Sequence, residues 1–204
     1  IQKAANLSMA SCGYPYYVGG TFDKRNSLLC TPTGVVRDAT FFKKAKDIDA
    51  LVETECVSID REKKEVHCIN LQSNEKQVIG YDKLILSMGA KPNKLPIPGA
   101  DLEGITTLLS MEDTDFLHSA ATSGKVTSAV VIGGGLIGVE TCEALVARGI
   151  KTTLVEMENQ ILTMLDPQLA KLVENHMKAK GVTLLTDCKL EAFTGEDSVL
   201  TGAT

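Results

Sequence analysis

The chain has 204 residues, of which 44% are hydrophobic, and this content is enough for one large domain or two small ones with packed cores. The formal charge at pH 7 is −5, from 21 Lys and Arg against 26 Asp and Glu, and the basic residues are scattered along the sequence. This pattern argues against a nucleic-acid partner and favours small molecules. No apolar run reaches the roughly 20 residues that span a bilayer, so we expect a soluble, cytoplasmic protein without a membrane partner.

The first element that the sequence predicts is a short helix near Pro15, a residue suited to the first helical turn, directly after Cys12. The positive end of a helix dipole stabilises a thiolate and so favours a nucleophilic cysteine. Because cysteine is also a common buried residue, position alone leaves a redox thiol and an inert residue equally open for Cys12. The other five lack a basic partner, form no C-x-x-C or His-containing metal pattern, and are interpreted as reduced, structural thiols: Cys30, Cys56, Cys68, Cys142 and Cys188.

Two strand-like segments follow, residues 51–59 and 64–71, separated by the turn-prone residues 60–63. This spacing predicts an antiparallel pair. Residues 81–87, with the apolar run Leu84-Ile85-Leu86, predict a buried strand, and residues 89–99 are too rich in Pro and Gly for regular structure.

From residue 129 the pattern alternates between strands and helices. Residues 129–132 predict a buried strand, followed by glycines and a helix that runs to about Arg148, with Gly149 as the left-handed residue after it. Residues 151–156 predict the next strand. After Asp166 and Pro167, which predict an N-cap and first helical residue, comes a helix with one apolar face and then a strand over residues 182–185. The face comprises Leu169, Leu172, Val173, His176 and Met177. This βαβαβ order predicts a parallel sheet covered by helices.

The glycines form the dinucleotide-binding pattern Gly133-x-Gly135-x-x-Gly138 between the first of these strands and its helix. Gly133 allows the tight turn, Gly135 the close approach of a pyrophosphate, and Gly138 the close packing of helix on strand. Glu156 ends the second strand, 21 residues after Gly135. Its carboxylate suits a ribose diol and repels the 2′-phosphate of NADPH, so NADH is favoured and NADPH is the alternative, although FAD is bound through the same pattern.

Four segments together resemble one family: residues 8–20 around Cys12, residues 81–90, residues 96–99 and the Gly133 motif, in this order. They resemble the single-cysteine pyridine nucleotide-disulfide oxidoreductases, and most of all the coenzyme A-disulfide reductases and NADH-dependent persulfide reductases. The resemblance covers essentially the whole chain.

The resemblance implies an α/β fold in which part of an FAD-binding domain, residues 1–108, precedes a Rossmann-like, doubly wound NAD(P)H-binding domain, residues 109–204. The parallel sheet of this fold carries an antiparallel excursion. The family's first FAD strand would precede Ile1, and its second FAD segment and dimerisation domain would follow Thr204, so we expect an internal fragment of a homodimeric enzyme.

The resemblance also assigns roles to single residues. Cys12 would be the thiol facing the flavin, with Ser8 and Ser11 contacting flavin or coenzyme A, and Tyr17 stands where related enzymes have a second cysteine. Leu136 stands where the family often has an aromatic residue covering the flavin. The remaining assignments are a backbone contact to the FAD adenine for Val57, the flavin-proximal strand end for Ser87 and Gly89, the NADH fingerprint for residues 133–138 including Leu136 and Ile137, a position near the nicotinamide and flavin for Glu140, and coenzyme A phosphates for Arg37 and Lys46.

The function implied is reduction of a small disulfide or persulfide, such as coenzyme A disulfide or a polysulfide, by NADH through FAD and a mixed disulfide at Cys12. Two alternatives stay open. In an NADH peroxidase or oxidase, Cys12 would cycle through a sulfenic acid. In an electron-transfer flavoprotein, Cys12 would be inert.

Overall fold

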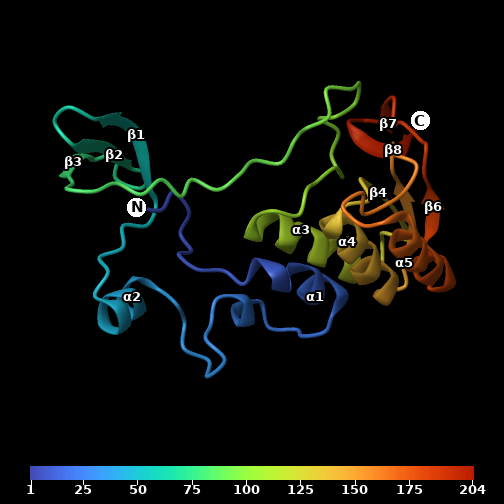
Figure 1. Cartoon of the computed structure of the whole chain (residues 1–204), viewed down its shortest axis with the longest axis horizontal. Coiled ribbons are helices and arrows are strands. Elements are labelled where there is room, and N and C mark those ends of the chain that lie inside the picture. Colours follow the sequence, from blue (N-terminus) through green and yellow to red (C-terminus); the bar gives the residue numbers. More distant parts are fainter. The chain divides into compact units, whose positions relative to one another are not determined.

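The computed structural model describes residues 1–204, and the chain folds as two compact units (Figure 1). The first unit comprises Ile1–Ala10 and Lys24–Ala90, and the second comprises Ser11–Asp23 and Lys91–Thr204. Packing therefore divides the chain earlier than the cofactor-domain boundary predicted near Leu108, and it places the segment that carries Cys12 in the second unit. None of the helices is long and apolar enough to cross a membrane.

The first unit is built around an antiparallel sheet in the order β1-β2-β3. The predicted antiparallel pair is confirmed, and the carboxylate of Asp60 fixes its turn by accepting hydrogen bonds from the N–H groups of Glu62 and Lys63, at 3.1 and 2.9 Å. The third strand was not predicted, because it is short and contains only two apolar residues. The elements are η2 (Arg25–Leu28), α2 (Ala39–Lys46), β1 (Thr54–Asp60), β2 (Glu65–Asn70) and β3 (Lys76–Gly80).

The strand predicted over residues 81–87 is wrong in this structure, which has no strand there. A strand needs a neighbouring strand to satisfy its N–H and C=O groups, and none of the three sheets extends to this segment. Its apolar side chains are solvent-exposed, with Ile85 at 87% and Leu86 at 59%. The predicted burial is therefore wrong as well, because apolar composition favours burial but does not supply a partner strand.

The second unit contains the predicted parallel sheet, in the order β4-β5-β6, and this confirms the βαβαβ reading and the fold class. Pairing between β4 and β5 runs from Ser128 opposite Lys151 to Ile132 opposite Val155. Helix α3 and the strands β7 and β8 were not predicted. The elements are η1 (Ser11–Gly13), α1 (Tyr14–Gly19), α3 (Met111–Thr122), β4 (Ser128–Ile132), α4 (Leu136–Ala147), β5 (Lys151–Val155), α5 (Pro167–Ala179), β6 (Thr183–Leu185), β7 (Phe193–Glu196) and β8 (Val199–Ala203).

Local signals set the C-terminal end of α4. Gly149 has φ +77°, its N–H donates to Val146, and the N–H of Ile150 donates to Leu145. This pair of hydrogen bonds is the Schellman arrangement, and it confirms the helix end predicted from Gly149. Helix α4 therefore stops where β5 must begin.

The core of the second unit lies between α4, β5 and α5 and contains Cys142, Leu154 and Ile161, each fully buried. Burial of one such aliphatic side chain contributes roughly 1.5–3 kcal/mol. The apolar face predicted for α5 is wrong in part, since Leu169 and Leu172 are 50% and 66% exposed. The buried stripe is instead Ala170, Glu174 and Met177, which has the same helical spacing; the Glu174 carboxylate is paired with Lys171 Nζ at 2.9 Å.

Candidate dinucleotide and thiol site

The glycine loop after β4 has the shape that the sequence pattern predicts. Gly133 adopts φ +100°, and its N–H donates to the carbonyl of Val155 at 2.9 Å, so the turn is tied to the end of β5. A Cβ on Gly138 would overlap the carbonyl oxygen of Gly133. A Cβ on Gly135, by contrast, would meet nothing within 4 Å. The three glycines thus allow the tight turn, the close packing of the helix and the close approach of a ligand, as expected for a dinucleotide loop.

The start of α4 is chemically suited to a phosphate. Gly135 is the N-cap residue and no side chain caps the helix, so the first N–H groups keep their hydrogen-bonding capacity. These groups and the helix dipole both favour an anion. Leu136 and Ile137, the first two helical residues, are 61% and 56% exposed beside the loop. Glu140 is exposed one turn further along α4.

Glu156 follows β5 directly and is held against the glycine loop. Its Oε2 accepts a hydrogen bond from the N–H of Gly134 at 2.6 Å, and its Oε1 accepts one from the N–H of Glu158 at 2.9 Å. A carboxylate has about four acceptor positions, so about two remain for a ribose diol. The residues present therefore fit the adenosine end of a dinucleotide, and the fixed negative charge disfavours a 2′-phosphate.

Gly134 is a site residue that sequence reasoning missed, because it occupies a variable position of the motif. A Cβ there would lie 2.7 Å from Ile161 Cγ2 and 3.2 Å from Glu156 Oε2. The carbonyl of Gly134 also accepts from the N–H of Leu162 at 2.8 Å. The only signal was that a glycine also stands between the motif glycines Gly133 and Gly135, and the reason for it lies in the loop after β5.

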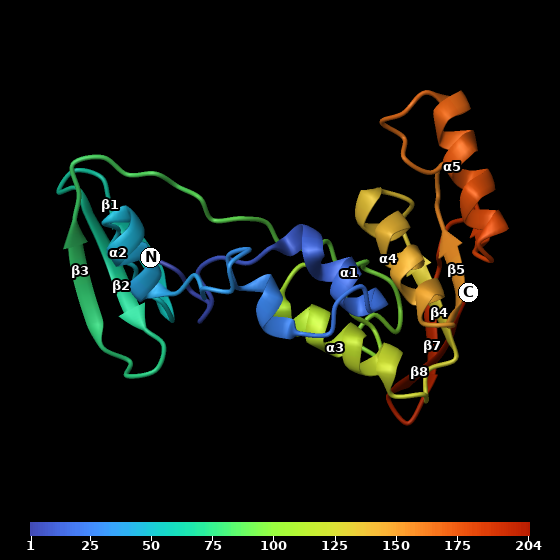
Figure 2. The same ribbon diagram turned by 90° about the horizontal axis from the view of Figure 1, so that it is seen from below.

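Cys12 lies in η1, is exposed, and directly precedes α1, as predicted. Helix α1 has Pro15 in its first turn and packs against α3 and α4 within the second unit (Figure 2). Tyr17 is buried and its ring stacks on that of His118, with centroids 4.2 Å apart and an interplanar angle of 5°. The tyrosine in place of a second cysteine is therefore a packing residue that anchors the thiol-bearing segment.

His118 and Arg148 complete this anchor. Arg148 donates from Nε to the carbonyl of Val18 at 2.8 Å. Burial, and then the positive charge of Arg148, lower the pKa of His118 below its usual value, which favours the neutral imidazole in the stack.

The remaining predicted residues fall in both units. Ser8, Arg37, Lys46, Val57, Ser87 and Gly89 belong to the first unit, whereas Ser11, Cys12, Glu140, Glu156 and residues 133–138 belong to the second. Within the second unit, the structure brings Glu156 and the glycine loop into direct contact. The roles of the first-unit residues stay predictions.

Two of the first-unit residues have informative surroundings. Val57 is the extra residue of a bulge in β1, because Cys56 pairs with Cys68 and Ser58 with His67. Val57 therefore has no residue directly opposite it on β2. Arg37 instead uses Nη2 and Nε to hold the carbonyls of Leu28 and Leu29, at 3.1 and 3.4 Å, so part of its guanidinium already has a structural role.

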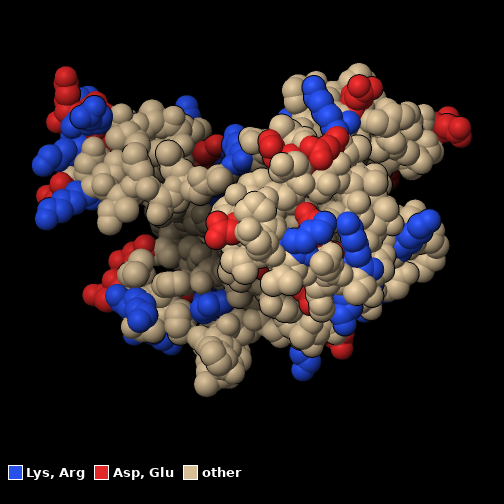
Figure 3. Space-filling model, turned by 45° about the vertical axis from the view of Figure 1, so that its right-hand side comes forward, with Lys and Arg blue, Asp and Glu red and all other residues tan.

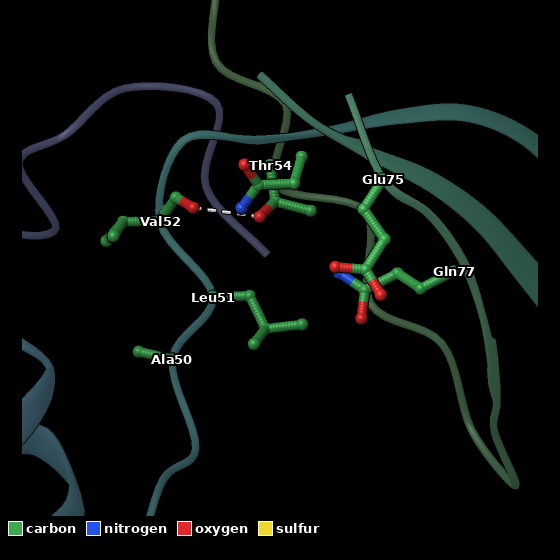
Figure 4. A pocket seen from close by; sticks show the side chains of 7 residues that line it. Ala50, Leu51, Val52, Thr54, Glu75 and Gln77 are labelled. Atoms are coloured by element: carbon green, nitrogen blue, oxygen red, sulfur yellow. Dashed lines mark hydrogen bonds between the residues drawn. The ribbon is translucent and has the colours of Figure 1, made fainter. Parts of the chain in front are cut away.

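A pocket lies on one face of the first unit's sheet (Figure 4). None of the predicted site residues lines it. Its polar side is formed by Thr54, Asn70, Glu75 and Gln77, and its aliphatic side by Ala50, Leu51 and Val52. On the molecular face in Figure 3, acidic and basic side chains are interspersed, and neither sign dominates.

The fold and the glycine loop define a dinucleotide-binding α/β protein with an exposed thiol on the same unit. The sequence profile of the family described as pyridine nucleotide-disulphide oxidoreductase matches residues 2–204, and the chain belongs to this family. The resemblance and the fold class predicted from the sequence are thereby confirmed.

Individual relatives differ in their named activities. A coenzyme A disulfide reductase of Staphylococcus haemolyticus is 33% identical over 181 residues, covering 89% of this chain and 39% of the relative. An NADH oxidase of Methanocaldococcus jannaschii is 28% identical over 201 residues, covering 98% of this chain and 43% of the relative. This chain therefore spans about two fifths of the length of these curated relatives.

Two solved structures are similar in both sequence and fold. An NAD-dependent persulfide reductase from A. fulgidus is 37% identical with a TM-score of 0.91, covering 97% of this chain and 37% of that one. The CoADR-RHD protein of Bacillus anthracis is 37% identical with a TM-score of 0.88, covering 98% of this chain and 35% of that one.

Proposed function

We propose that the whole protein is an FAD-dependent NADH:disulfide oxidoreductase that reduces coenzyme A disulfide, or a related persulfide or polysulfide, through a mixed disulfide at Cys12. The observation that carries the proposal is that Cys12 is exposed and has no second cysteine on α1, where the buried Tyr17 anchors the helix instead. A single thiol needs a substrate that supplies the second sulfur. Disulfides and persulfides do so, which is why they are favoured as acceptors.

The nicotinamide cofactor would be held by the loop Gly133–Gly138 and by Glu156. The N–H groups at the start of α4 would bind the pyrophosphate, and the fixed carboxylate would accept hydrogen bonds from the ribose hydroxyls. NADH is the favoured donor and NADPH the alternative, because the same carboxylate repels a 2′-phosphate. Leu136, Ile137 and Glu140 would line the nicotinamide side.

FAD would be held in part by the backbone of Val57, by Ser8 and Ser11, and by Ser87 and Gly89. The position of Val57 in the β1 bulge, with no residue directly opposite it, is compatible with this role. When bound, FAD supplies two-electron transfer between nicotinamide and thiol. Arg37 and Lys46 are proposed contacts to coenzyme A phosphates, and the whole protein is proposed to be a homodimer.

The chemistry at Cys12 is thiol–disulfide exchange. The Cys12 thiolate attacks one sulfur of the substrate, a mixed disulfide forms, and the first thiol leaves. Two electrons from NADH and one proton then break the mixed disulfide, release the second thiol and restore the Cys12 thiolate. In sum, one disulfide, one NADH and one proton give two thiols and NAD⁺.

The decisive experiment is steady-state NADH oxidation by the full-length protein with coenzyme A disulfide, a persulfide, peroxide and oxygen as acceptors. We expect the sulfur acceptors to be preferred and the Cys12→Ser variant to lose their turnover. A preference for peroxide or oxygen would instead support an NADH peroxidase or oxidase, the activity class named for one relative. Unchanged disulfide turnover in Cys12→Ser would support an electron-transfer flavoprotein.

A further inference from the structure

A second pair of thiols lies away from Cys12, in the sheet of the first unit. Cys56 on β1 and Cys68 on β2 are direct partners in the antiparallel register, and both are free thiols. Directly opposed residues in an antiparallel pair point to the same face of the sheet. The two sulfurs therefore belong to one face, although their cysteines are twelve positions apart in sequence.

The hydrogen bonds beside the pair show which type of partner it is. The N–H of Thr54 points away from β2 and donates to Gln2, at 3.0 Å, whereas Leu71 donates to the carbonyl of Glu53. Because the two types of pair alternate along an antiparallel ladder, Cys56 and Cys68 form a non-hydrogen-bonded pair. The Cα atoms of such a pair lie about 4.5 Å apart, within the roughly 4.4–6.8 Å that a disulfide requires.

The two thiols differ in access. Cys68 is 1% exposed, whereas Cys56 lies on the edge strand, is exposed, and donates from Sγ to the carbonyl of Ser58 at 3.7 Å. Burial, and then the nearby Cys56, raise the pKa of Cys68, which favours the protonated thiol at this buried position. The pair thus combines an accessible first sulfur with a sheltered second one.

The surroundings allow a small molecule to reach this face. The pocket in Figure 4 includes Thr54, two residues before Cys56, and Gln77, the cross-strand partner of Cys68. By strand alternation these side chains share the face of the cysteine pair. Glu75 adds a negative charge to the pocket, which favours uncharged or cationic molecules over anionic ones.

We propose that Cys56 and Cys68 form a second thiol–disulfide site, which uncharged low-molecular-weight disulfides oxidise to a cross-strand disulfide. Cys56 thiolate attacks the small disulfide, forms a mixed disulfide and releases one thiolate. Cys68, as its thiolate, then attacks the Cys56 sulfur and displaces the second small thiolate. The small disulfide takes up the two electrons, both cysteines lose their protons to solvent, and the protein gains one bond. This site does not depend on the activity proposed for Cys12.

The test is exposure of the folded protein to bis(2-hydroxyethyl) disulfide, followed by alkylation, trypsin digestion without reduction, and mass spectrometry. Trypsin cleaves between the two cysteines, at Arg61, Lys63 and Lys64, so a disulfide joins the two peptides 47–61 and 65–76. We expect this linked pair as the main product, and its loss on treatment with dithiothreitol. A lasting hydroxyethyl adduct on Cys56 with Cys68 unlinked, or no reaction at either cysteine, would overturn the proposal.

Single variants separate the two steps. In Cys68→Ala, the resolving sulfur is missing, and we expect a stable adduct on Cys56. In Cys56→Ser, we expect Cys68 to stay unmodified because it is buried. Cys30→Ser is the matched control and should link the two peptides at the unsubstituted rate, and circular dichroism establishes that each variant is folded. An adduct on Cys68 in folded Cys56→Ser would contradict the order of the two steps.

Discussion

Arg148 at the end of α4 donates a hydrogen bond to the main-chain carbonyl of Val18 on α1, across 130 positions of sequence. Its Nη2 is buried without a hydrogen-bond partner, and the guanidinium lies against Gly20, where an added Cβ would be 2.6 Å from Cζ. One arginine thus connects the thiol-bearing segment with the helix that follows the glycine loop. The guanidinium of Arg148 can take this position because Gly20 has no side chain.

Gly20→Ala is therefore expected to destabilise the second unit. Gly20 has φ +84°, which costs a non-glycine residue about 1–2 kcal/mol, and the methyl group would also displace Arg148. Gly34→Ala is the matched control, because Gly34 has φ +85° but open space around its Cβ. Urea unfolding should show a larger loss for Gly20→Ala than for Gly34→Ala. Equal losses would mean that the Arg148 contact carries no energy of its own.

Substitutions in the glycine loop should separate folding from cofactor binding. Gly138→Ala brings a methyl group onto the Gly133 carbonyl and should lower the thermal midpoint of unfolding. Gly135→Ala places its methyl in open space at an ordinary φ of −74°, so stability should change by under about 1 kcal/mol while NADH affinity falls. Differential scanning fluorimetry and NADH fluorescence titration measure the two effects. Full NADH affinity in Gly135→Ala would argue against pyrophosphate binding at this loop.

Glu156→Gln should weaken NADH binding and reduce discrimination against NADPH. The variant loses the negative charge that faces the Gly134 N–H, and hydrogen bonds to charged groups contribute about 1.5–3 kcal/mol, or roughly 10–100-fold in affinity. Glu158→Gln is the control, because only its main-chain N–H contacts Glu156. The measurement is the ratio of the dissociation constants for NADPH and NADH. An unchanged ratio in Glu156→Gln would rule out a contact between this carboxylate and the ribose.

The stack of Tyr17 on His118 should make stability depend on acidity. Because burial and Arg148 lower the pKa of His118 in the folded state, the fold favours the neutral ring. This contribution is present above the unfolded pKa of about 6.5 and is lost as the pH falls through the lower, folded pKa. Urea unfolding between pH 7.5 and 5 should show a steeper loss for the natural protein than for His118→Phe. That variant keeps a stacking ring and cannot titrate, so parallel pH profiles would show that His118 does not contribute.

Much of the second unit could be predicted because its signals are local. The end of α4 follows from Gly149 alone, and the βαβαβ order follows from apolar runs separated by glycine and proline. The buried face of α5 could not be predicted, since two stripes have helical spacing and only packing against Ile161 and Val182 selects between them. A stripe containing Glu174 becomes acceptable once Lys171 covers the carboxylate.

In the candidate site, too, the residues set by local sequence could be predicted and those set by distant contacts could not. The residues of the glycine pattern and Glu156 could be found from sequence spacing, because the motif places them on one loop and at one strand end. Gly134 and Arg148 could not, because the reasons for both lie in residues far along the chain, Ile161 and Val18. The exposed segment around Ile85 is the opposite case: its local pattern predicted a strand, but no partner strand lies beside it.

Because the second unit is assembled from Ser11–Asp23 and Lys91–Thr204, the backbone passes between the units three times, and no single cut of the gene separates them. A truncated product that starts at Lys91 would lack α1. Its surface would then carry the ring of His118, the guanidinium of Arg148 and the side of α4 near Ala144, which α1 covers in the intact chain. Such a product would tend to aggregate and would alter the surroundings of the proposed nicotinamide site, so dissection of this protein has to keep the thiol segment and the glycine loop in one polypeptide.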